Sequence, residues 1–447
     1  MSASLENSPH SSDESRTPLL QDGIVNVGTD LYTEPHTPVV LNVETSGSDC
    51  DTIEEVEDVN TMDLEQPPMR SAILTMTPLF MGYAALITLQ DNIKKRLGIH
   101  DASSAASYEF SFAVSWLYFG NLIFRLMHNV IFSQFSPRIR VCIAYSFMAA
   151  ALTTLALAFY VFDVKHVAWV FVAYMCGGVA IGTFESNLIS TITPLGHRTK
   201  VWAQYGISIG FNGVSIGAFL LYAASPDDLP LQCGTYLVIA AANLAGLVFF
   251  YTQIPSINFA STEQGLALFW KDIRRFREWV FYVLPYSLPM VINMAGLGFF
   301  SAVQLYIYNV DSVPLWWGST TTVPLNAFRA VYNVHSLLGD AFGRKTAYGR
   351  AKLIHPGWFL ICTFVGGGLI LSKIALVAPL GMFLVMFANG SVYATTTKFI
   401  DVAVPSRFNL IALSFWLLVG DVGSFIGSNL VNEGRVAVGE VPTAAPR

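Results

Sequence analysis

The stretch TTVPLNAFRAVYNVHSLLGDAFGRKTAYG, residues 321–349, is long and mostly apolar, yet it carries an aspartate and an arginine near its end. Asp340 and Arg344 are four residues apart, so a helix would place them on one face. Ionisable groups are costly in hydrocarbon. Where they occur in a membrane helix, they line a polar site or pair with another polar group. The composition of the whole chain decides whether this stretch is such a helix.

The composition belongs to a membrane protein with many spans. The chain has 447 residues, of which 53% are hydrophobic and only 13% charged, and its mean hydropathy is +0.50. A soluble protein of this length carries more charge and fewer apolar residues. The sequence therefore predicts an all-α polytopic membrane protein.

Eleven segments are long enough to cross about 30 Å of hydrocarbon as helices. They are residues 72–92, 107–133, 140–163, 167–193, 203–224, 233–254, 279–308, 322–346, 354–375, 377–400 and 408–431. The longest gap separates the sixth from the seventh. We therefore expect a six-helix bundle over 71–254 and a five-helix bundle over 279–431, in a two-bundle arrangement like that of the major facilitators.

The first 70 residues differ from the membrane part. They hold 15 acidic residues and 2 arginines, whereas the other 377 hold 16 acidic and 23 basic residues. We predict a disordered cytoplasmic tail, because such a segment cannot bury enough apolar surface to fold. Within it DESRTPLL resembles an acidic dileucine sorting signal, with Leu19 and Leu20 as the pair, although a chance Leu-Leu is an equal alternative.

Basic residues set the predicted orientation. Fourteen flank the helix ends on the side of the tail and seven flank the opposite ends, which favours a cytoplasmic N-terminus. The loop 255–278 lies on the cytoplasmic side and contains Leu266, Phe269, Ile273 and Phe276 at helical spacing, which predicts an amphipathic linker helix. Residues 432–447 would form a short external tail.

The ionisable residues within the predicted spans are the candidates for function. Asp340 and Arg344 would form the polar floor of a substrate cavity, or else a turn at the cytoplasmic end of the helix that braces a gate. Glu185 and Asp421 are candidates for proton coupling or gating. Glu185 has a structural alternative as the partner of Arg125 or Arg329, and Asp421 has one as a hydrogen-bonded packing residue.

Arg125 and His128 lie near the inner end of the second span. Long basic side chains in such positions commonly extend to the membrane surface, so we expect Arg125 to reach the interface. No pattern of Cys, His or acidic residues indicates a metal site, and no GxxxxGK[ST] loop indicates nucleotide hydrolysis. We predict no cofactor, no metal and no enzymatic activity.

Several short motifs are similar, in chain order, to those of equilibrative nucleoside transporters. The matching residues are Pro194, Gln204, Gly206, Asp340, Gly343, Arg344, Phe387, Asn389 and Gly390. The outline of eleven spans with a long loop between the sixth and seventh is similar too. The Pro-Trp-Asn motif of the family's first span is missing, and Thr88, Leu89 and Gln90 stand there instead. The chain thus resembles a distant or substrate-shifted member.

The resemblance implies a carrier of nucleosides or nucleobases that works by alternating access, facilitative or coupled to protons. Asp340 and Arg344 would bind the ribose hydroxyls, and Gln204 would read the edge of the base. Asn389 and Gln90 are further candidates. The implied partners are this small-molecule substrate, the lipid bilayer and, through Leu19 and Leu20, a sorting adaptor, with no nucleic acid.

Other interpretations stay open. SPRIRV before the third span, the glycine-rich end of the fifth and the Leu-Leu pair are also compatible with the battenin family, and thus with a battenin-like or other major-facilitator-type intracellular carrier. The membrane would then be endosomal or lysosomal rather than the plasma membrane. A membrane receptor or scaffold is a third interpretation, against which eleven spans with buried charges argue.

Overall fold

The computed structural model describes residues 67–99, 105–225, 228–255, 266–307, 312–349 and 354–437. The predictions made for the N-terminal tail, including the sorting signal Leu19 and Leu20, lie outside the described residues. Most of the predicted external tail lies outside them too.

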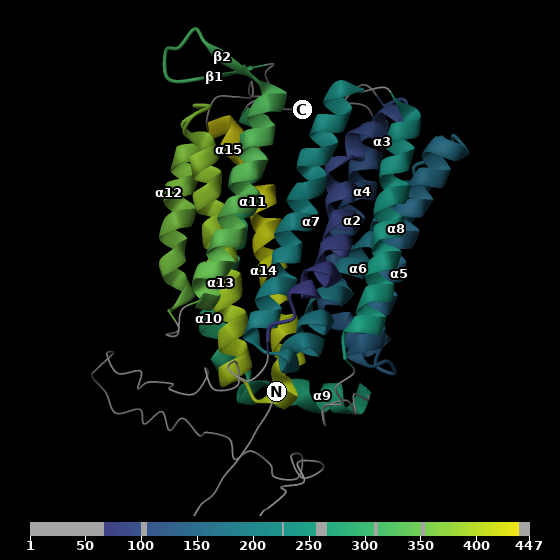
Figure 1. Cartoon of the computed structure of the whole chain (residues 1–447), viewed down its shortest axis with the longest axis vertical. Helices are drawn as coiled ribbons and strands as arrows, with labels where there is room; N and C mark the ends of the chain where they lie inside the picture. Colours follow the sequence, from purple (N-terminus) through teal and green to yellow (C-terminus); the bar gives the residue numbers. More distant parts are fainter. Residues whose placement is uncertain are drawn as a thin grey trace, which may run out of the picture. The chain divides into compact units, whose positions relative to one another are not determined.

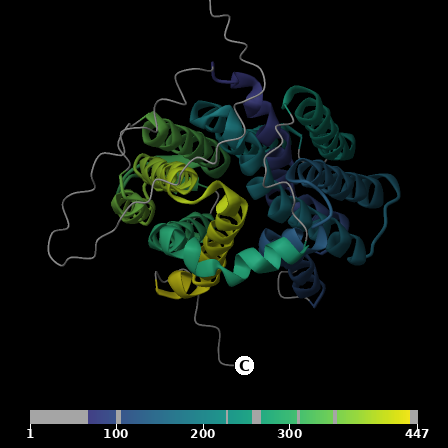
Figure 2. The same cartoon turned by 90° about the horizontal axis from the view of Figure 1, so that it is seen from below.

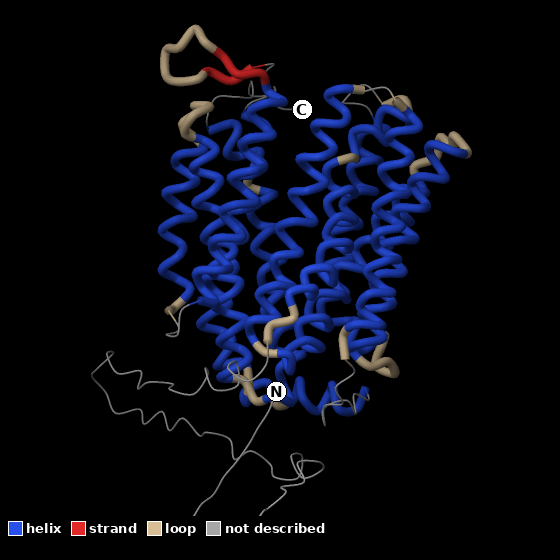
Figure 3. Tube along the Cα trace, in the orientation of Figure 1, coloured by secondary structure: helices blue, strands red, loops and turns tan. Residues whose placement is uncertain are grey.

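The described chain is almost entirely helical (Figure 3). The major helices are α2 (Ile73–Thr88), α4 (Ala105–Ile131), α5 (Pro137–Ala156), α6 (Ala168–Ile192), α7 (His197–Ala224), α8 (Leu229–Gln253), α10 (Val280–Ile307), α11 (Leu325–Gly349), α12 (Leu360–Ile370), α13 (Ala378–Ala403) and α14 (Asn409–Asn429). The short elements are η1 (Arg70–Ala72), α3 (Gln90–Arg96), η2 (Leu157–Val161), η3 (Thr193–Leu195), α9 (Leu266–Arg274), η5 (Phe276–Glu278), η6 (Pro356–Phe359), η7 (Ser406–Phe408) and α15 (Val431–Ala437).

Nine helices of the described part are long and apolar enough to cross a membrane. The two other predicted spans correspond to α11 and to α12 with η6. The second of these runs over only Pro356–Ile370, and α11 is too polar, because it carries four charged residues, two of them Asp340 and Arg344. The prediction of an all-α polytopic membrane fold is confirmed.

A small hairpin precedes α11 and was not predicted. Strands β1 (Ser312–Pro314) and β2 (Thr322–Pro324) pair antiparallel, with Val313 opposite Val323. The span predicted from residue 322 therefore begins as a strand, and the helix starts at Leu325. Proline has no N–H to donate within a helix, and Pro324 stands where α11 begins.

The helices pack as two bundles (Figure 1). In the first, α2 packs against α7 and α8, α4 against α6, and α5 against α6 and α8. In the second, α13 packs against α11 and α12, and α10 against α14 and α13. The bundles meet chiefly where α7 contacts α11 and where α4 contacts α14.

Glycines bring α11 and α13 unusually close. A Cβ on Gly390 would lie 2.9 Å from Asp340 Oδ1 and 3.1 Å from the Arg344 backbone nitrogen. Gly343 packs against the backbone of α13, and a Cβ on Gly343 would lie 3.0 Å from the backbone nitrogen of Ser391. Small residues allow such close approach between membrane helices. The glycines of the DAFGR and ANGS stretches thus fix how α13 faces the charged pair.

Candidate functional site between the two helix bundles

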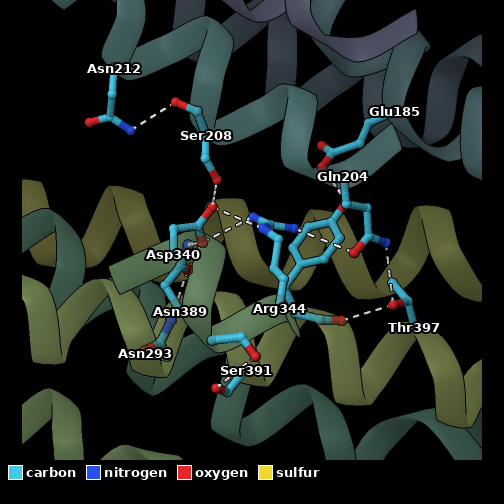
Figure 4. Close-up of polar contacts among 12 residues, drawn as sticks. Glu185, Gln204, Ser208, Asn212, Asn293, Asp340, Arg344, Asn389, Ser391 and Thr397 are labelled. Atoms are coloured by element: carbon cyan, nitrogen blue, oxygen red, sulfur yellow. Dashed lines mark hydrogen bonds and ion pairs between the residues drawn. The ribbon is translucent and has the colours of Figure 1, made fainter. Parts of the chain in front are cut away.

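Three helices each present a polar stripe with members four residues apart, and the stripes face one another. The members are Gln204, Ser208 and Asn212 on α7, Asp340, Arg344 and Tyr348 on α11, and Asn389, Tyr393 and Thr397 on α13. A spacing of four keeps residues on one helix face. Because α7 belongs to the first bundle and the other two helices to the second, the stripes form a polar seam between the bundles (Figure 4).

Asp340 and Arg344 pair with each other within α11. Arg344 Nε donates to Asp340 Oδ2 at 2.9 Å and Nη2 donates to Oδ1 at 3.2 Å, so the contact is bidentate. Each residue is 1% exposed. The pair lies inside the helix, which continues to Gly349, and does not form a turn at its end.

Asp340 also accepts hydrogen bonds from both bundles. The Ser208 hydroxyl of α7 donates to Oδ2 across the interface. From α13, Asn389 Nδ2 donates to Oδ1 at 3.4 Å. Asn293 of α10 holds Asn389 by donating to its Oδ1 at 3.0 Å, and Thr363 donates to Asn293 at 2.9 Å. The carboxylate is thus fixed by contacts from several helices (Figure 4).

Arg344 makes two further contacts. Its Nη1 donates to Gln204 Oε1 on α7 at 3.5 Å, and its Cζ lies 4.5 Å from the ring centre of Tyr393, a cation–π distance. Gln204 Nε2 in turn donates to Thr397 at 3.5 Å, and the Thr397 and Tyr348 hydroxyls share a hydrogen bond of 2.8 Å. Gln204 is fully buried, so the predicted base-reading residue lies beside the charged pair.

A second ionic cluster lies next to the first. Arg125 of α4 pairs with Glu185 Oε2 of α6 at 2.8 Å and with Asp421 Oδ2 of α14 at 2.6 Å. Arg125 is 4% exposed, so the expectation that it reaches the membrane surface is wrong: two carboxylates hold it inside. The Tyr393 hydroxyl donates to Glu185 Oε1, and one tyrosine therefore touches both clusters.

Two more contacts join the bundles. His128 of α4 lies 3.3 Å from the Ser414 hydroxyl of α14. Lys200 of α7 pairs with Asp401 of α13, which also accepts from Asn409 Nδ2 at 3.0 Å. Lys200, Gln204 and Ser208 of α7 and Ser414 of α14 lie toward the N-terminal ends of their helices, whereas the contacting residues of α4, α11 and α13 lie toward the C-terminal ends. These ends lie on one side of the membrane, the predicted cytoplasmic side, where the bundles are held together. Asp421 lies deeper, past the middle of α14.

The structure brings together most of the predicted site residues but not all. Asp340, Arg344, Gln204 and Asn389 share one network. Gln90 starts α3 and, among the described residues, has no hydrogen bond to that network. The candidates for proton coupling, Glu185 and Asp421, share Arg125. No cluster of metal-binding side chains occurs in the described ranges.

Sequence reasoning missed Ser208 and Tyr393. Both follow a predicted site residue by one helical turn, since Ser208 comes four residues after Gln204 and Tyr393 four after Asn389. That spacing was the available signal. The partnership of Arg125 with Asp421 had no such signal, because 296 residues separate them.

No family model and no curated protein sequence matches the chain. Solved structures do. FucP, a major facilitator superfamily transporter solved in the outward conformation, matches with a TM-score of 0.58 at 17% identity over 83% of this chain and 93% of FucP.

Two further structures match in the same way. The proton:xylose symporter XylE gives 0.56 at 17% identity, covering 82% of this chain and 90% of XylE. The peptide transporter POT gives 0.52 at 13%, covering 82% and 89%. The likeness to equilibrative nucleoside transporters stays a prediction. At these identities the comparison establishes architecture, and the chain has a major-facilitator-like fold.

Proposed function

We propose that this protein is a membrane transporter that carries nucleosides or nucleobases by alternating access. The observation that carries the proposal is the buried Asp340–Arg344 pair, which α11 presents to Ser208 and Gln204 of the opposite bundle. The matched structures are transporters, which supports the general class and a non-enzymatic role. The substrate is inferred from the chemistry of the pair and from the motif resemblance.

The groups of this pair suit a ribose. A carboxylate accepts hydrogen bonds from adjacent hydroxyls, and a guanidinium donates to ring and hydroxyl oxygens. In this structure Asp340 accepts a hydrogen bond from the Ser208 hydroxyl, and Arg344 donates one to the side-chain oxygen of Gln204. A ribose hydroxyl would take the place of the Ser208 hydroxyl, and a ring or hydroxyl oxygen would take the place of the Gln204 oxygen.

This replacement couples binding to movement. Ser208 and Gln204 belong to α7, whereas Asp340 and Arg344 belong to α11, so a substrate that displaces them breaks contacts between the bundles. A ligand shifts a conformational equilibrium only through contacts that differ between the two states. Substrate binding at this pair would therefore favour opening at the end where the bundles now meet.

The test is uptake of radiolabelled adenosine, uridine and hypoxanthine into proteoliposomes. We expect saturable uptake by the wild type and loss of it in Asp340→Asn. Asp163→Asn is the matched control, because Asp163 lies in a loop with a side chain 57% exposed. Absence of uptake of all three by folded wild-type protein would refute the nucleoside assignment. A battenin-like carrier of another solute would then be the better hypothesis.

Proton coupling is a second property that one observation favours. The two clusters contain three carboxylates (Asp340, Glu185, Asp421) and two guanidiniums (Arg344, Arg125), so their charges sum to −1 when all are ionised. Buried unbalanced charge is costly, and one bound proton would neutralise the set. Glu185 already accepts the Tyr393 hydroxyl, and its side chain is 6% exposed against 17% for Asp421. Asp421 is therefore the proposed proton carrier.

A pH gradient across the proteoliposome tests this property. We expect the wild type to accumulate substrate when the gradient is applied, and Asp421→Asn to exchange substrate without accumulating it. Accumulation by Asp421→Asn at the wild-type level would overturn the assignment.

We propose that the protein acts either in the plasma membrane or in the membrane of endosomes or lysosomes. Its test is the location of a tagged chain with and without Leu19→Ala/Leu20→Ala. Redistribution of the double variant to the cell surface would support the sorting signal. An unchanged location would contradict it.

A further inference from the structure

The helix α9 and the residues after it expose basic and aromatic side chains together. Trp270 is 48% exposed and Phe276 is 47% exposed. The basic side chains of Lys271, Arg274 and Arg277 are exposed too. We call these five residues the α9 surface. The nearby Arg275 lies 3.6 Å from Glu278, and both are exposed.

The opposite side of α9 is fixed to the protein. Asp272 is 8% exposed and accepts from Arg407 Nε at 3.1 Å, which ties α9 to the turn that precedes α14. The indole of the buried Trp279 donates to the Asp272 carbonyl at 3.3 Å, and α9 also packs against α4 of the first bundle. These anchors set which side chains of α9 face outward.

The position of α9 places this surface at the level of the lipid headgroups. The helix follows α8 and precedes α10, both of which can span the membrane, and Figures 1 and 2 show it lying across the helix ends. It belongs to the predicted cytoplasmic side, where anionic lipids concentrate. A tethered helix with exposed Trp and Phe among cations matches the chemistry of that interface.

We propose that the α9 surface binds anionic phospholipid headgroups of the leaflet beside it. Lys271, Arg274 and Arg277 contact the phosphates and carboxylates of the lipids, while Trp270 and Phe276 enter the boundary between headgroups and acyl chains. The occupant is lipid rather than a soluble acidic protein, because the surface stands at the membrane and combines charge with aromatic groups that prefer it. The inference does not depend on which solute the protein carries.

Tryptophan quenching by brominated lipids tests the proposal in the full-length protein. The chain is reconstituted in phosphatidylcholine with a minority of phosphatidylserine, with bromine on the serine lipid in one preparation and on an equal fraction of choline lipid in the other. The difference between wild type and Trp270→Phe isolates the signal of Trp270. We expect brominated phosphatidylserine to quench this signal about twofold more, and the excess to shrink in high salt.

The variant Lys271→Gln/Arg274→Gln/Arg277→Gln should bring the two lipids to equal quenching. Its matched control is Lys94→Gln/Lys95→Gln/Lys165→Gln, which removes three lysines from the opposite helix ends and should leave the excess unchanged. Melting temperatures check that both variants fold. Equal quenching by the two lipids in the wild type would overturn the proposal. The proposal would also be overturned if the first variant kept the extra quenching by brominated phosphatidylserine. A reduction of that extra quenching by an added acidic protein, with no effect of the first variant, would overturn it in the same way.

Discussion

Replacing Asp340 by asparagine puts an NH₂ group in place of one carboxylate oxygen, so one hydrogen-bond acceptor of the buried pair becomes a donor. The carboxylate now accepts from Arg344, Ser208 and Asn389. Both carboxylate oxygens face donors, so in either orientation of the amide its NH₂ group would face a donor of Arg344 and one of Ser208 or Asn389. The substitution also leaves the buried guanidinium without the carboxylate that it contacts directly. Removing one partner of a buried ion pair costs about 3–5 kcal/mol.

The double variant separates stability from function. Adding Arg344→Gln to Asp340→Asn removes the stranded charge, and two neutral amides can hydrogen-bond to each other. We expect the double variant to recover most of the lost stability, because replacing both partners of a buried ion pair costs much less than removing one of them. Uptake should stay lost in both variants, because the substrate needs the carboxylate and the guanidinium themselves.

Stability is measured by thermal unfolding in detergent, with tryptophan fluorescence as the readout. Function is measured by uptake into proteoliposomes. Asp163→Asn serves as the exposed control in both assays. Two results would refute the reasoning. Wild-type stability of Asp340→Asn would mean that the pair is not an energetic unit. Wild-type uptake by the stable double variant would mean that the pair only holds the bundles together.

Two further substitutions probe the packing and the second inter-bundle ion pair. Gly390→Val should destabilise the protein by about 1–3 kcal/mol, because its side chain would collide with Asp340; Gly368→Val in α12, where a Cβ meets nothing within 4 Å, should melt close to wild type. Lys200→Met should lower the melting temperature by removing the cation of a buried ion pair, and adding Asp401→Asn should restore part of it. A melting temperature that falls further in this double variant would contradict that account.

Sequence reasoning was successful where one helix is enough for the argument. The placement of Asp340 and Arg344 on one helix face follows from their spacing alone, and their bidentate contact confirms it. The same spacing rule extended by one turn would have added Ser208 and Tyr393. The start of α11 was predicted three residues early, because the apolar pattern continues through Thr322–Pro324, which pairs as a strand.

Reasoning from single segments failed where two distant helices decide the outcome. Arg125 was expected to reach the interface because it lies near the inner end of its span. Glu185 and Asp421 come from α6 and α14, and together they offset the cost of burying the guanidinium. The alternative that Glu185 partners Arg125 was available from the sequence but could not be chosen there over Arg329.

The sequence by itself determined the helical membrane architecture, because hydrocarbon demands long apolar helices with internally satisfied backbones, and these are readable segment by segment. It also determined which residues are chemically unusual in that setting. Only the tertiary structure decided their partners. Asp421 meets Arg125 across 296 residues and Tyr393 meets Glu185 across 208, and such contacts depend on helix rotation and bundle packing, which no local pattern encodes.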